Sequence, residues 1–167
     1  MPEQQANDSA PWWDDRHRPR TSDVRNALEE CSRQVAAWGL ALPAIDPVVV
    51  DFGLGDFRRR GLIQYTVANE VAAGYCGKLL FVSDGQTCPA HRHAVKHETF
   101  FVMRGQVVMN IADQTRTLSP GKTLTVPTGV THSFTGCGNA LLLEVSMPST
   151  AGDNCFLDLR IGDRGVV

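Results

Sequence analysis

From Val48 onward the chain is a succession of short apolar runs, and this pattern is the feature that most restricts which folds the chain can adopt. The runs are rich in Val, Leu, Phe, Tyr and Thr, and turn dipeptides such as Asp84-Gly85, Arg104-Gly105 and Pro120-Gly121 separate several of them. The predicted strands are 48–52, 62–67, 76–83, 87–93, 97–103, 106–111, 114–118, 123–126, 131–135 and 140–146. Because no helical pattern interrupts them, they favour a closed or sandwiched antiparallel barrel over an α/β sheet.

A helix is predicted ahead of the strands, over residues 22–38. Its apolar side chains recur at helical spacing from Val24 to Trp38. Gly39 stands where a glycine commonly ends a helix, so the prediction includes a boundary as well as a type of structure.

The first twenty residues differ from the rest because they are polar and contain three prolines. We expect them to form a flexible arm, with the adjacent Trp12 and Trp13 docking onto a neighbouring surface such as another subunit. The expected organisation is an arm over 1–20, a helix and linker over 21–47, and a single barrel over 48–167.

Composition excludes several classes of function. A net charge of −2 with scattered arginines offers no basic stripe for nucleic acid. No apolar run approaches the ~20 residues that span a bilayer, and the start of the chain lacks the features of a secretory signal. Five cysteines without a Cys-x-x-Cys pair argue against a disulfide framework or a zinc ribbon. We expect them to be buried small hydrophobes in a reducing compartment, which favours the cytoplasm.

Three histidines and one glutamate are spaced as the ligands of one metal ion. His91 and His93 are two apart, so on a strand both imidazoles project from the same face. Glu98 adds an anionic oxygen, and His132 adds a third nitrogen from a distant segment. This set suits Mn, Fe, Co, Ni or Zn and leaves coordination positions open for a substrate.

The segments Gly85–Gly105 and Gly121–Gly136 resemble the two motifs that define the cupin superfamily. Every signature position is filled except the last, where Gly136 stands in place of the usual asparagine. The resemblance implies a cupin-type antiparallel β-barrel, a double-stranded β-helix or jelly roll, preceded here by the N-terminal helix. It also implies that the metal is bound inside the barrel by His91, His93, Glu98 and His132.

Further landmarks are similar to the D-lyxose isomerase family, which are cupin-type aldose–ketose isomerases. They are residues 51–57, 77–80, Lys96, 131–134, 144–146 and 153–156. The chain departs from that family at Thr99 and at Cys155, where an aspartate and an arginine are usual. The resemblance implies a free sugar as substrate, such as D-lyxose/D-xylulose or D-mannose/D-fructose, and a divalent metal, typically Mn²⁺. The cupin resemblance also implies a homodimer.

Isomerisation of a sugar moves a proton between C2 and C1, so titratable side chains must face the open side of the metal. Lys96 shares strand parity with Glu98 and should project into the barrel, where a dication would lower its pKa. Glu144 is a carboxylate within an apolar run. We expect Lys96 and Glu144 to act as acid and base, in an order that the sequence leaves open. The expected substrate contacts are Lys78 and Asp153, with Phe134 as an apolar wall.

Each of these residues also has an ordinary explanation. Lys96 could be an exposed lysine at a hairpin tip, and Glu144 could form a structural ion pair with an arginine. Two other functions stay open at this point. One is a cupin dioxygenase, whose pocket should be mostly apolar, and the other is a non-catalytic sugar-binding cupin, which needs no acid–base pair.

Overall fold

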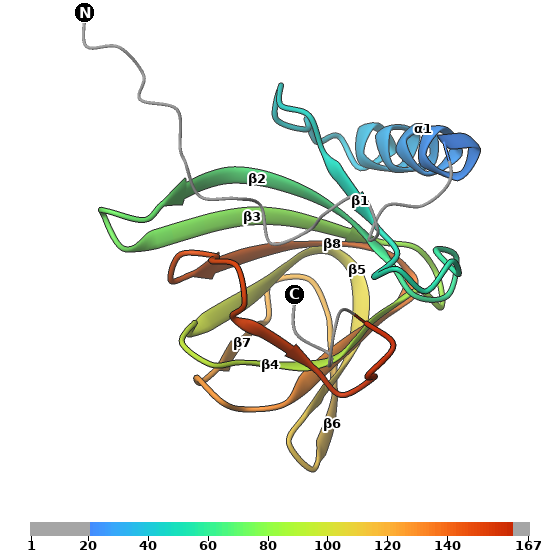
Figure 1. The fold of residues 1–167 in the computed structure, drawn as a ribbon. Helices are drawn as coiled ribbons and strands as arrows, with labels where there is room; N and C mark the ends of the chain where they lie inside the picture. Colours follow the sequence, from blue (N-terminus) through green and yellow to red (C-terminus); the bar gives the residue numbers. More distant parts are fainter. Residues whose placement is uncertain (1–20, 162–167) are drawn as a thin grey trace, which may run out of the picture.

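The computed structural model describes residues 21–161, and the predicted arm with Trp12 and Trp13 lies outside this range. One helix and nine strands make up the described fold (Figure 1). They are α1 (Thr21–Ala37), β1 (Val48–Val50), β2 (Leu62–Glu70), β3 (Tyr75–Val82), β4 (Thr87–His93), β5 (Glu98–Ile111), β6 (Gln114–Leu118), β7 (Thr123–Val126), β8 (His132–Ser146) and β9 (Asn154–Phe156).

All the strands pair antiparallel and form one sheet that curls around a common interior (Figure 1). The main path runs β1-β2-β3-β8-β4-β9, and β5 pairs with β6, β7 and β8. Strand β8 is the organising element because it pairs with β3, β4 and β5. The mostly-β cupin fold with an N-terminal helix is confirmed.

Two predicted breaks between strands are wrong, because glycines let the strands bend and continue. Predicted strands 97–103 and 106–111 are one strand, β5, with register irregularities around Gly105. Gly105 has φ 71°, and a Cβ there would collide with the carbonyl oxygen of Asn139. Strand β8 likewise joins 131–135 to 140–146 through Gly136, where a Cβ would collide with the carbonyl oxygen of Ser83. Strand β9 was not predicted.

The helix packs on the outer face of the sheet beside β1 and β2 (Figure 1). Its buried Cys31 and Val35 contribute to a cluster with Ile63, Phe81 and Leu141. The predicted helix boundary is correct to within one residue, and Gly39 follows it with φ 68°. Among the described residues, no helix combines the length and the apolar character needed to cross a membrane.

The five cysteines are all free thiols. Cys31, Cys76 and Cys88 are buried as predicted, whereas Cys137 is exposed and Cys155 is half-buried. Cys137 lies between two glycines in the bend of β8. The prediction of five buried cysteines is therefore wrong at these two positions.

Candidate metal centre

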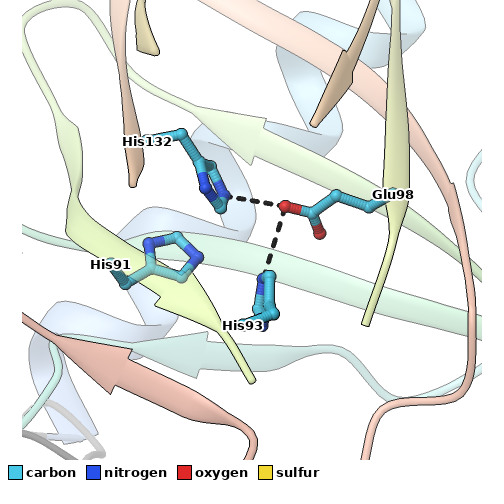
Figure 2. Close-up of side chains that lie close together, drawn as sticks. All are labelled: His91, His93, Glu98 and His132. Atoms are coloured by element: carbon cyan, nitrogen blue, oxygen red, sulfur yellow. Dashed lines mark ion pairs between the residues drawn. The ribbon is translucent and has the colours of Figure 1, made fainter. Parts of the chain in front are cut away.

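The four predicted ligands meet at one point inside the curled sheet (Figure 2). His91 and His93 come from β4, Glu98 begins β5, and His132 begins β8. The pairing of His91 with His132 across β4 and β8 brings together ligands that lie far apart in the sequence. All four side chains are buried, and their ligand atoms lie within 4.8 Å of one another.

The polar atoms of this cluster lack the partners that buried groups need. Oε1 of Glu98 lies 2.7 Å from Nε2 of His132 and 3.3 Å from Nε2 of His93. These three atoms are buried without a hydrogen bond to any described residue. Buried polar atoms are rarely left unsatisfied, and a carboxylate oxygen facing imidazole nitrogens is a donor set for a borderline divalent ion. The residues present therefore fit a metal ion, whose identity they leave open.

Backbone carbonyls orient two of the imidazoles. Nδ1 of His91 lies 2.8 Å from the carbonyl oxygen of Pro89, and Nδ1 of His132 lies 3.2 Å from that of Val130. When Nδ1 carries the proton and donates it to the carbonyl, Nε2 is left as a lone-pair donor facing the cluster. Burial lowers the pKa of His91 well below its usual value, and the neighbouring His132 and His93 lower it further. The neutral form that a metal requires is thus the form this site favours.

The third imidazole lies beside a carboxylate, although its Nδ1 makes no hydrogen bond to a described residue. Oδ2 of Asp153 lies 3.4 Å from Nδ1 of His93, and burial lowers the pKa of His93. The same carboxylate accepts hydrogen bonds from the backbone N–H groups of Val95 at 2.6 Å and Lys96 at 3.2 Å. Both oxygens of Asp153 are therefore engaged within the chain. This geometry favours a role in holding the loop after β4, in contrast to the sugar contact predicted from sequence.

Lys96 lies inside the protein, so its explanation as an exposed lysine at a hairpin tip is wrong. Its side chain is 5% exposed, and Nζ lies 2.8 Å from Oε2 of Glu98. A second carboxylate oxygen, Oε1 of Glu144, accepts a hydrogen bond from Nζ at 2.9 Å. Burial lowers the pKa of Lys96, but the Glu144 and Glu98 carboxylates outweigh it and raise that pKa above its usual range. The charges of the chain thus act against the lowering expected from a nearby dication.

Glu144 is also buried, and lysines rather than an arginine surround it. Its Oε1 accepts hydrogen bonds from Nζ of Lys96, from Nζ of Lys78 at 3.3 Å and from Oγ of Ser146 at 3.0 Å. Burial raises the pKa of Glu144, but the Lys78 and Lys96 ammonium groups outweigh it, so the pKa is lowered. Two buried cations therefore hold one buried carboxylate in its ionised form.

A single cavity opens onto both the ligand cluster and the lysine–glutamate group. Phe134 lines it, at the position predicted for an apolar wall, and Lys78 lines it as well. The remaining lining residues are Phe52, Leu62, Gln64, Leu80, Cys88, His91, His93, Lys96, Glu98, Phe100, Glu144, Asn154 and Phe156. The lining thus combines aromatic and aliphatic side chains with charged ones.

Sequence reasoning missed Ser146 and Asn154 at this site. Ser146 lies two positions after Glu144 on the same strand, so strand parity could have found it. Asn154 begins β9, which carries no alternating apolar pattern, and it was noted only within the landmark 153–156.

Comparisons with known proteins agree with this geometry. Residues 79–146 match the Cupin domain family. The chain is 32% identical to a D-lyxose/D-mannose isomerase of Thermosediminibacter oceani, over 68% of this chain and 77% of that protein. It is 28% identical to a D-lyxose ketol-isomerase of Cohnella laeviribosi, over 85% of this chain and 94% of the relative.

Solved structures extend the likeness in fold to nearly the whole chain. An L-ribose isomerase of Acinetobacter sp. DL28 superposes with a TM-score of 0.75 over 92% of this chain and 98% of its own, at 14% identity. The L-ribose isomerase of Cellulomonas parahominis gives a TM-score of 0.74 over 91% and 98%, at 16% identity. At such identities these two structures speak for the fold alone. Taken with the sequence relatives and the buried ligand cluster, they lead to one conclusion: the chain belongs to the D-lyxose isomerase family of cupin proteins.

Proposed function

We propose that this protein is a metal-dependent aldose–ketose isomerase that interconverts a free sugar by proton transfer between C2 and C1. The substrates proposed are D-lyxose/D-xylulose or D-mannose/D-fructose, after the activities named for the sequence relatives. One observation carries the proposal: a buried lysine and a buried glutamate, 2.9 Å apart, line the same cavity as the ligand cluster.

The metal is proposed to be held by His91, His93, Glu98 and His132. A divalent ion bound there would polarise the sugar carbonyl and stabilise charge that develops on the sugar oxygens. Mn²⁺ is the ion proposed, on the family resemblance, with Zn, Co, Fe and Ni as alternatives that the same donor set accepts.

Glu144 is proposed as the base. Its lowered pKa keeps it ionised at neutral pH, so it can remove the proton from C2 and return it to C1. Lys96 is proposed as the acid, because its ammonium lies beside Glu144 and keeps its protons available for the sugar oxygens. The hydroxyl proton must pass from O2 to O1 as the carbonyl moves, and an ammonium can donate at one oxygen while the other loses its proton.

The other cavity residues are proposed to bind the sugar. Lys78 lines the cavity and would donate to a hydroxyl, while Phe134 would pack against the C–H face of the sugar. Asp153 was predicted as a further contact, and the bonds of its two oxygens support a holding role instead.

Neither of the two competing functions requires the buried lysine–glutamate group that lines this cavity. A dioxygenase or a sugar-binding cupin has no use for two buried lysines on one buried glutamate, because an ionic group of this kind is costly to desolvate. The charged group therefore favours proton-transfer chemistry over both alternatives.

The test uses the full chain loaded with Mn²⁺ and incubated with D-lyxose or D-mannose. We expect ketose to form, and we expect deuterium from heavy water to appear at C2 of the recovered aldose. No exchange with any aldose of a broad panel, at full metal occupancy, would refute the isomerase. An uptake of O₂ would instead support the dioxygenase.

A homodimer and a cytoplasmic location are further proposals. They rest on the cupin resemblance and on the five cysteines that form no disulfide, respectively. Native mass spectrometry of the purified chain tests the dimer, and fractionation of the source cells tests the location.

A further inference from the structure

The segment after β8 contacts Lys78, one of the residues that line the cavity, through one hydroxyl. Nζ of Lys78 donates to Oγ of Ser149 at 2.6 Å and to Oε1 of Glu144 at 3.3 Å. Lys78 is only 3% exposed, so its ammonium depends on these partners. Since an ammonium has three protons, two fixed bonds determine where the third one points.

The backbone of Ser149 is itself held by the side chain of Asn69. Nδ2 of Asn69 donates to the carbonyl oxygen of Ser149 at 3.0 Å, and the N–H of Ser149 donates to Oδ1 of Asn69 at 2.9 Å. Two reciprocal bonds from one amide side chain fix both the position and the direction of the Ser149 backbone. The hydroxyl is therefore presented to Lys78 from a defined place.

The two hydrogen bonds between the Asn69 side chain and the Ser149 backbone form a clamp. A β-bulge in β2 makes this clamp possible. Thr66 pairs with Lys78, and Asn69 pairs with Cys76, so three steps on β2 match two steps on β3. The register shift lies between Thr66 and Ala68. In a regular strand, side chains alternate, and Asn69 would face away from Lys78. The extra residue reverses the alternation and turns Asn69 to the inner face.

We propose that Ser149 is a positioning residue of the proton-transfer site, which orients the Lys78 ammonium on Glu144. This inference rests on the proposed function, because it assigns Glu144 the role of base. Every hydrogen bond that Glu144 makes to a described residue uses Oε1. With Oε1 held by three donors, Oε2 is the oxygen left to meet the sugar. Ser149 acts on this arrangement through Lys78 and touches neither the substrate nor the metal ligands.

The first measurement is the kinetics of three single variants. Ser149→Ala should lower kcat about 10-fold with KM changed little, because a hydrogen bond to a charged group is lost and the base loses its alignment. Ser149→Thr keeps the hydroxyl and should restore most of the rate. Thr150→Ala is the matched control, since the neighbouring threonine is exposed and should leave both constants unchanged.

The clamp predicts that Asn69 and Ser149 act as one unit. Asn69→Ala should lower kcat in the same direction as Ser149→Ala. The double variant should be little worse than Ser149→Ala alone, because Asn69 acts only by holding a hydroxyl that Ser149→Ala has already removed. Fully additive losses would show that Asn69 acts by another route and would count against the proposal.

A second readout does not depend on activity. In protein labelled with ¹⁵N-lysine, the ammonium signal of Lys78 is assigned by its loss in Lys78→Met. Its proton exchange with water should accelerate in Ser149→Ala and stay slow in Thr150→Ala, because the hydroxyl shields and holds the ammonium. Equal exchange rates and a wild-type kcat in Ser149→Ala would overturn the inference.

The two hypotheses fail in different ways. If the wild type isomerises sugars and Glu144→Gln does not, while Ser149→Ala is normal, only the role of Ser149 is rejected. If the wild type turns over no aldose, the proposed function is rejected and the kinetic part of the inference falls with it. The ammonium exchange then still decides whether Ser149 holds Lys78.

Discussion

The two faces of the curled sheet solve opposite problems. The outer face under α1 buries Ile63, Phe81 and Leu141 against the helix, and its burial directly stabilises the fold. The inner face near the metal centre buries Lys96 and Glu144, whose desolvation is costly. The comparison teaches that apolar packing, under the helix and elsewhere in the interior, supplies the stability that a buried charged group consumes. Changes in the cluster under the helix should therefore alter stability, whereas changes in the charged group beside the metal centre should alter chemistry.

The largest expected effect is a loss of turnover on the inner face. Glu144→Gln should lower the rate of isomerisation by about 10²–10⁴-fold, the usual contribution of a general base. The amide keeps the size of the side chain, and the four metal ligands are untouched. Metal content by mass spectrometry is the control and should remain at the wild-type level. If the variant keeps both its metal and its full rate, Glu144 is not the base, and the inner face does not carry the chemistry through this residue.

The next effect belongs to the outer face. Phe81 is fully buried beneath the helix, so Phe81→Ala should lower the free energy of unfolding by about 3–5 kcal/mol. Urea denaturation measures the change, and Phe81→Leu is the milder variant if alanine prevents folding. Leu159→Ala is the matched control, because Leu159 is 71% exposed and its loss should cost less than about 0.5 kcal/mol. The folded fraction should bind Mn²⁺ as the wild type does.

A smaller effect is expected where the chain supports a ligand. Asp153→Asn removes the charge beside His93 while keeping the size of the side chain. Loss of such a supporting carboxylate typically weakens metal binding by about 10–100-fold. Competition with a chelator measures the affinity. If the affinity for metal is unchanged and the KM for sugar is raised, Asp153 contacts the sugar as the sequence predicted and does not support the metal ligand.

The smallest effect is a dependence of stability on alkaline pH, to which two buried groups of the outer face contribute. Burial raises the pKa of Cys31 from its usual 9.0 to about 12, and burial raises that of Tyr65 from 10.0 to about 12. A raised folded pKa contributes stability that is fully present below the usual value and is lost as pH rises toward 12. Thermal unfolding between pH 8 and 11 should therefore show a falling Tm.

Cys31→Ala is the variant that isolates the thiol in this titration. Its curve should be flatter than that of the wild type, because the Cys31 thiol no longer contributes, while Tyr65 and Cys88, whose pKa burial also raises, still do. A slope identical to that of the wild type would assign the alkaline loss to another part of the molecule.

Much of the site followed from strand parity and motif spacing. Lys96 and Glu98 lie two residues apart, and both point inward as parity predicted, although Lys96 lies in the loop between β4 and β5. The predictions that were wrong involve positions where the backbone is irregular. Gly105 and Gly136 allow strands to continue where breaks were expected, because close approach of another backbone excludes a Cβ. Ser149 and Asn69 meet only through a bulge, and a bulge reverses parity without leaving a mark in composition.

The residues carried by strand β8 determine which sequence changes this chain can tolerate. It carries a metal ligand at His132, helix-covered Leu141 on its outer face and the inward Glu144, all at fixed spacing. Replacing a side chain alters one of these functions at a time. Inserting or deleting a single residue between His132 and Glu144 would turn the inward-facing side chains of the rest of the strand outward, and the outward-facing ones inward. This stretch should therefore tolerate amino-acid replacement far better than any change in its length.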